Sequence, residues 1–89
     1  MPPQTKDFTD VQKKALTEVV ILIEKGGVDG ATLHAGLHGI KERVGIAPKE
    51  LFSAIYLSFL GRDSGPQAGW FLSTLDPDFV ITRLRAVVA

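Results

Sequence analysis

Residues 48–61 read PKELFSAIYLSFLG, and this segment carries the strongest signal for the fold. On a helix of this length, apolar side chains fall on nearly every side and are interrupted only by small residues. Pro48 suits the first position of a helix, and Gly61 is a typical C-terminal stop. The segment therefore predicts a central helix with neighbours all around it, and we expect Ile55 and Phe59 to be almost inaccessible.

Two further helices are predicted on the N-terminal side of this segment. Residues 9–12 read TDVQ, a capping box that begins a helix extending to Lys25. Residues 20–22 widen the apolar stripe of this helix, which consists of Val11, Ala15, Leu16, Val19 and Ile23. The second helix is expected between Asp29, as its cap, and Gly45, and its apolar face consists of Leu33, Leu37, Ile40 and Val44.

Two short helices are predicted after residue 61. One begins near Pro66, carries Trp70, Phe71 and Leu75, and stops at Asp76. Asp76 caps the last helix, which begins at Pro77 and has on its apolar side Phe79, Val80, Leu84, Val87 and Val88. No segment alternates as a strand does. The predicted fold class is all-α, a compact bundle of about five short helices, with residues 1–8 as a flexible lead-in and residues 9–89 as a single helical domain.

The composition is that of one ordinary globular domain, with 89 residues of which 45% are hydrophobic and 22% charged. The absence of cysteine excludes disulfides and cysteine-based zinc or nucleophile sites. No apolar run approaches the ~20 residues that span a bilayer, and residues 1–7 do not read as a secretory signal. We therefore expect a cytoplasmic location and no membrane partner. Ten basic residues balance ten acidic ones, so charge alone cannot hold nucleic acid tightly.

Few residues suggest catalysis or metal binding. His34 and His38 share one side of the second helix at a spacing that can hold zinc, but no third ligand is apparent. No serine lies in a nucleophile elbow. The acidic residues that stand out all have helix-start roles: Asp10, Asp29, Glu50 and Asp76. The sequence therefore predicts no catalytic, metal-binding or cofactor-binding residue.

Residues 60–70, LGRDSGPQAGW, form the most distinctive turn of the chain. It is defined by three glycines at intervals of four and one proline: Gly61, Gly65, Gly69 and Pro66. One interpretation is a structural corner in which the glycines serve the backbone. The other is a phosphate site formed by the amides of residues 67–69, with Arg62 close by.

Residues 48–73, followed by FVITRL at 79–84, resemble the C-terminal anticodon-binding region of class I lysyl-tRNA synthetases. That family typically ends with an aromatic helix, a Leu-Gly-x-x-x-Gly-Pro corner and a last helix close to Phe-Val-Ile-x-Arg-Leu. Glutamyl-tRNA synthetases have a related ending, but Tyr56 and residues 79–81 look nearer the lysyl type. The resemblance is specific over residues 46–85 and only general over the first two helices. It implies a helical cage that binds the anticodon.

The two ATP motifs of class I synthetases, His-x-Gly-His and Lys-Met-Ser-Lys-Ser, do not occur in this sequence. The chain therefore resembles an excised or free-standing C-terminal domain, and we expect it to have no enzymatic activity alone. The resemblance implies ATP and magnesium only for the parent enzyme, which ligates lysine to tRNA. The implied partners are the tRNA anticodon stem-loop and the rest of the synthetase.

Anticodon bases are single-stranded and can be read by stacking and by hydrogen bonds to their edges. The candidate phosphate contacts are six cations: Lys41, Arg43, Lys49, Arg62, Arg83 and Arg85. Trp70 is a candidate stacking residue, although a tryptophan beside Phe71 and Leu72 is more often part of the core. Arg83 matches the arginine of the family motif, and its alternative role is an ion pair with a carboxylate at a helix start.

Three other functions remain open at this level. The first is the equivalent domain of a glutamyl-tRNA synthetase. The second is a helical protein-interaction module without RNA binding, which includes self-association through helix one because the run Val19–Ile23 exceeds what a small bundle buries. The third is DNA binding by a helix-turn-helix, which is the least supported alternative because no helix presents several basic and amide residues on one side.

Overall fold

The computed structural model describes residues 8–26, 29–62, 65 and 67–88. Within these residues the chain is helical and contains no strand, which confirms the all-α fold class. The helices are α1 (Asp10–Glu24), α2 (Gly30–Val44), α3 (Pro48–Leu60), α4 (Ala68–Ser73) and α5 (Pro77–Val88). None of the described helices is long and apolar enough to cross a membrane.

The helix ends follow local rules, as the sequence predicts. Thr9 Oγ1 accepts the Gln12 backbone N–H at 3.0 Å while Gln12 Oε1 accepts the Thr9 N–H at 2.9 Å, which completes the capping box of α1. The Asp29 carboxylate accepts the Thr32 N–H at 2.8 Å and caps α2. Gly45 and Gly61 end α2 and α3 at φ values of 76° and 72°, a region that glycine enters without steric cost.

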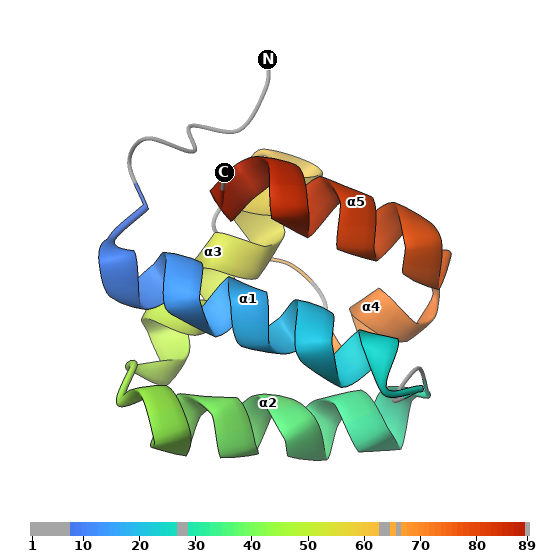
Figure 1. Cartoon of the computed structure of the whole chain (residues 1–89), viewed down its shortest axis with the longest axis horizontal. Helices are drawn as coiled ribbons and strands as arrows, with labels where there is room; N and C mark the ends of the chain where they lie inside the picture. The colour runs from blue at the N-terminus through green and yellow to red at the C-terminus, as the bar shows by residue number, and fades with distance from the viewer. Residues whose placement is uncertain (1–7, 27–28, 63–64, 66, 89) are drawn as a thin grey trace.

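Helix α1 lies in the middle of the bundle, with α2 on one side and α5 on the other (Figure 1). Helix α3 packs against α1, α4 and α5, and the short α4 packs mainly against α2. The Gln12 side chain donates to the Glu50 carbonyl oxygen at 3.0 Å, which joins the first turn of α1 to that of α3. The expectation that residues 48–61 form the central helix is therefore wrong, because α1 occupies that position.

The hydrophobic core is formed by buried side chains from all five helices. Ile55 is fully buried, as predicted, but Phe59 is only partly buried. The ring of Phe59 lies at the side of the core between Phe71 and Phe79, with centroid distances of 6.1 and 5.8 Å. The expectation that Phe59 is almost inaccessible is therefore wrong. The largest fully buried apolar side chains are Leu16, Val19, Leu33, Ile40, Leu51, Ile55, Val80, Leu84 and Val87.

Three details at the helix ends differ from the sequence expectations. Phe8, at the end of the expected lead-in, is buried in the core, whereas residues 1–7 lie outside the described part of the chain. Val11 was assigned to the apolar stripe of α1 but is 41% exposed. Helix α4 begins at Ala68 and ends at Ser73, so Leu75 follows the helix; Pro66, the expected start, lies outside the described residues.

The apolar surplus expected on helix one is largely absorbed by the bundle. Val19, Val20 and Ile23 are buried and Leu22 is partly buried, whereas Ile21 is 38% exposed. This run faces two neighbouring helices, because α1 lies between α2 and α5 (Figure 1). The reason for expecting self-association through helix one is therefore removed.

Candidate nucleic-acid interface

Three of the six candidate cations form contacts between helices of the domain. Arg43 forms an ion pair with Glu18 at 2.8 Å, and Arg85 forms one with Glu24. Arg83 is partly buried, and its Nε donates to the Ser58 carbonyl oxygen at 2.7 Å, near the end of α3. The alternative role expected for Arg83 was an ion pair, but its partner is a backbone carbonyl. These three arginines join neighbouring helices.

The other three cations are differently placed. Lys49 and Arg62 are exposed and form no ion pair or hydrogen bond among the described residues. The Lys41 ammonium lies 3.3 Å from His38 Nδ1. Lys49 is in the first turn of α3 and Arg62 follows its last turn, so about 20 Å of helix separates them. Sequence reasoning grouped these cations, but the structure places Lys49 and Arg62 at opposite ends of α3.

The glycine corner has clear backbone functions. Gly61 adopts a positive φ, and a Cβ at Gly65 would lie 3.1 Å from the Tyr56 ring. A Cβ at Gly69 would lie 2.6 Å from the backbone nitrogen of His34, so this glycine lets α4 approach α2. Ala68 and Gly69 are buried, and α4 has only six residues. These observations support the structural interpretation of the corner over the phosphate site.

Trp70 is not a core residue, which corrects the preferred sequence interpretation. It is 51% exposed, and its ring lies directly on Gly30, the first residue of α2. An added Cβ at Gly30 would overlap the indole ring. The ring is therefore held in place by the start of α2 while about half of the residue remains open to solvent, a position in which it can stack on a base.

A series of aromatic rings crosses α3, α4 and α5 and ends at the surface. It runs from Tyr56 to Phe71 at 6.2 Å and continues through Phe59 to Phe79. The sequence pattern places Phe79 on the apolar side of the last helix, but Phe79 is 52% exposed. Phe79 is exposed because it lies away from the buried face of α5. Val80, Leu84 and Val87 form that face, and Phe79 lies about 100° from Val80 around the helix. Phe79 is thus an exposed ring that sequence reasoning missed as a stacking candidate.

One pocket lies between α2, α3 and the start of α4, with a volume of about 350 Å³. Its walls are His34, Leu37, His38, Phe52, Tyr56, Gln67, Ala68 and Gly69. The rings of His34 and His38 meet edge to face with centroids 4.8 Å apart, and His34 Nδ1 lies 3.0 Å from Gln67 Nε2. Burial raises the pKa of the Tyr56 hydroxyl above its ordinary value. Within the described chain, no three His, Cys, Asp or Glu side chains meet as a metal site would require.

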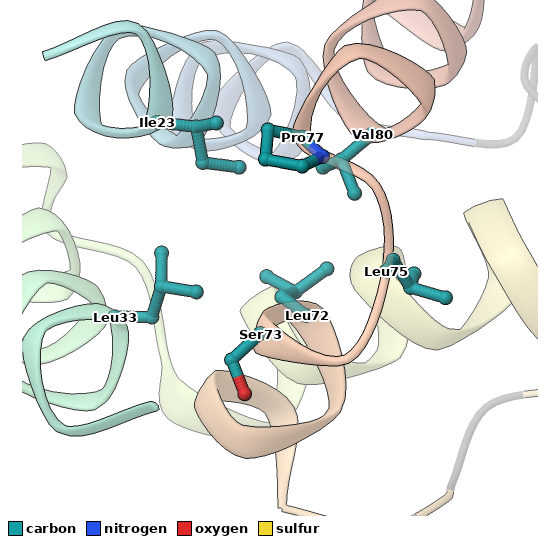
Figure 2. A pocket seen from close by; sticks show the side chains of 7 residues that line it. All are labelled: Ile23, Leu33, Leu72, Ser73, Leu75, Pro77 and Val80. Carbon is teal, nitrogen blue, oxygen red and sulfur yellow. The ribbon is translucent and has the colours of Figure 1, made fainter. Parts of the chain in front are cut away.

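A second pocket, of about 170 Å³, lies where α1, α2, α4 and α5 meet (Figure 2). Aliphatic groups form most of its wall: Ile23, Leu33, Leu72, Leu75, Pro77 and Val80. Ser73 also lines it, but the Ser73 hydroxyl points away from the cavity and donates to the Trp70 carbonyl oxygen at 2.6 Å. This pocket offers no polar side chain for recognising a nucleotide.

No family model and no solved structure matches this chain. Among curated proteins, however, the chain is homologous to the C-terminal domain of archaeal class I lysine–tRNA ligases. Lysine–tRNA ligase 1 of Methanosarcina acetivorans is 37% identical over 96% of this chain and 19% of its own length. The lysine–tRNA ligases of Halobacterium salinarum and Methanosphaera stadtmanae are 37% and 34% identical, each over 89% of this chain.

These matches confirm the lysyl-type resemblance of the C-terminal half and extend it over the first two helices. The chain spans about a fifth of the length of the curated relatives it matches.

Proposed function

We propose that this chain is the tRNA-binding domain of a lysine–tRNA ligase and that it recognises the anticodon stem-loop. The similarity to lysine–tRNA ligases along 96% of the chain carries this proposal. Two features of the surface support it: the exposed rings of Trp70 and Phe79 can stack on unpaired bases, and Lys49 and Arg62 are exposed cations suited to phosphate.

The proposed role is confined to tRNA binding. The sequence lacks both ATP motif strings of class I synthetases, so lysine activation with ATP and magnesium belongs to the rest of such a ligase. The purified chain is expected to show no ATP–pyrophosphate exchange with lysine. Exchange activity that persists after contaminating ligase has been removed would contradict this division of labour.

The charge of the domain determines how strongly it binds. With ten basic and ten acidic residues, and with Arg43 and Arg85 held in ion pairs, few cations are left for phosphates. We expect weak binding, with a slope of the logarithm of affinity against the logarithm of salt concentration of about −2 to −4.

The test is a fluorescence titration of a labelled lysine anticodon stem-loop, beside a stem-loop of equal length with another anticodon. We expect tighter binding to the lysine anticodon and a several-fold loss of affinity in Lys49→Ala and Arg62→Ala. Arg85→Ala is the matched control, because its guanidinium already pairs with Glu24 and its loss should change affinity less. Failure of the folded chain to bind either stem-loop at low salt would contradict the proposal.

A further inference from the structure

We propose that the pocket between α2, α3 and the start of α4 receives one unstacked nucleobase, with Lys41 and Lys49 contacting the adjoining phosphates. This proposal rests on the proposed function and specifies where on the domain a base of the tRNA is bound. The pocket adjoins the glycine corner, because Gln67, Ala68 and Gly69 line it, whereas Lys49 lies at the opposite end of α3 from Arg62.

The shape and lining of the pocket suit a planar ring. Its volume of about 350 Å³ lies within the ~300–1,000 Å³ of small-molecule pockets. Phe52 and Tyr56, one turn apart on α3, form an aromatic wall, and Leu37 contributes an apolar contact. Aromatic walls accept any base, because every base has a π-face.

The polar groups of the pocket suit the edge of a base. Gln67 Nε2 lies 3.0 Å from His34 Nδ1, and Lys41 Nζ lies 3.3 Å from His38 Nδ1, so each ring nitrogen faces an N–H donor. An imidazole that accepts through Nδ1 carries its proton on Nε2 and presents an N–H donor there. The Gln67 side-chain oxygen supplies an acceptor. Donors beside an acceptor complement the hydrogen-bonding edge of an unpaired base.

Two cations lie about one helical turn from residues that line this pocket. Lys41 follows His38 by three residues on α2, and Lys49 precedes Phe52 by three residues on α3. Residues at this spacing share a helix face, so each cation extends a wall of the pocket. The partner of Lys41 is an imidazole rather than a carboxylate, and Lys49 has no ion pair among the described residues. Both charges are therefore open to the phosphates that flank a bound base.

The direct test is an NMR titration that follows the imidazole resonances of His34 and His38 in the intact chain. The probes are UMP, CMP, AMP and GMP, with ribose 5-phosphate as the matched ligand without a base. We expect the mononucleotides to shift both histidines and the Phe52 ring resonances in a saturable manner. Ribose 5-phosphate should leave these resonances in place.

The second arm measures stem-loop affinity in variants. Phe52→Leu removes the ring but keeps an apolar side chain, and Gln67→Ala removes the amide. Each is expected to weaken binding about tenfold, the size of one lost stacking or base-edge contact. Thr82→Ala, an exposed polar residue on α5, is the control and should bind as the unmodified chain does. Circular dichroism melts check that every variant is folded.

The outcomes separate the two proposals. If the stem-loop binds but the variants bind equally well and no mononucleotide shifts His34 or His38, the pocket assignment is wrong and tRNA binding stands. If mononucleotides shift the histidines but no stem-loop binds, the pocket stands and the proposed function is wrong. Equal shifts with ribose 5-phosphate and the mononucleotides would overturn the pocket as a base site and leave a phosphate contact only.

Discussion

At Gly69 the backbones of α4 and α2 approach closely. A Cβ there would lie 2.6 Å from the backbone nitrogen and 2.8 Å from the Cα of His34. Backbone atoms of a packed helix cannot turn aside as a side chain can, so Gly69→Ala must push the two helices apart. We expect a loss of about 1–3 kcal/mol in the free energy of unfolding, measured by urea denaturation.

Gly39→Ala is the matched control for that substitution. Gly39 is also in a helix, but the nearest atom to an added Cβ is the end of the flexible Arg43 side chain at 3.4 Å. Alanine favours a helix by up to about 1 kcal/mol over glycine, so this variant should be more stable than the parent chain. Equal effects of the two substitutions would show that the close approach at Gly69 is not a packing constraint.

At the scale of the element, the start of α2 links stability to pH. The Asp29 carboxylate accepts the backbone N–H and the hydroxyl of Thr32, each at 2.8 Å. The backbone hydrogen bond from Thr32 is the main cause of a pKa below the ordinary value of 3.8 for this carboxyl group. Because the folded state favours ionised Asp29, its contribution is complete above the unfolded pKa and is lost as pH falls through the lowered folded pKa.

Asp29→Ala should therefore lower the melting temperature at pH 7. The difference in melting temperature between this variant and the parent chain should become smaller below about pH 4. Asp29→Asn is the control, because asparagine retains a capping oxygen without a charge. It should keep most of the stability at neutral pH. Circular dichroism melts between pH 2.5 and 7 measure the melting temperatures of both variants. If the melting temperature of Asp29→Ala fell further below that of the parent chain in acid, the assigned role of the cap would be contradicted.

At the scale of the whole molecule, the position of α1 between α2 and α5 (Figure 1) predicts a monomer. Most of the apolar run 19–23 is buried within one chain, and Ile21 at 38% exposure is its main exposed residue. We expect sedimentation equilibrium at tens of micromolar to give a mass near 9.6 kDa. Ile21→Asp should leave that mass unchanged, whereas a dimer that this substitution dissociates would restore self-association through helix one.

The sequence by itself determined the helices and most of their ends. Caps and stops depend on residues within one turn, such as Thr9 with Gln12 and Asp29 with Thr32, so they can be read without knowing the fold. The resemblance to lysyl-type synthetases is also a property of the sequence, and the comparisons confirm it. The expected start of α4 near Pro66 was less accurate, because a six-residue helix has too few turns to show a periodic pattern.

Only the tertiary structure decided which side chains are free to act. The partners of Arg85 and His34 lie 61 and 33 residues away, and no local pattern relates residues at such separations. The exposure of Phe59 and Phe79 depends on how α3, α4 and α5 meet, since a helix carries more apolar residues than its neighbours can cover. The pocket between α2 and α3 likewise exists only because the chain returns at Gln67 to close it.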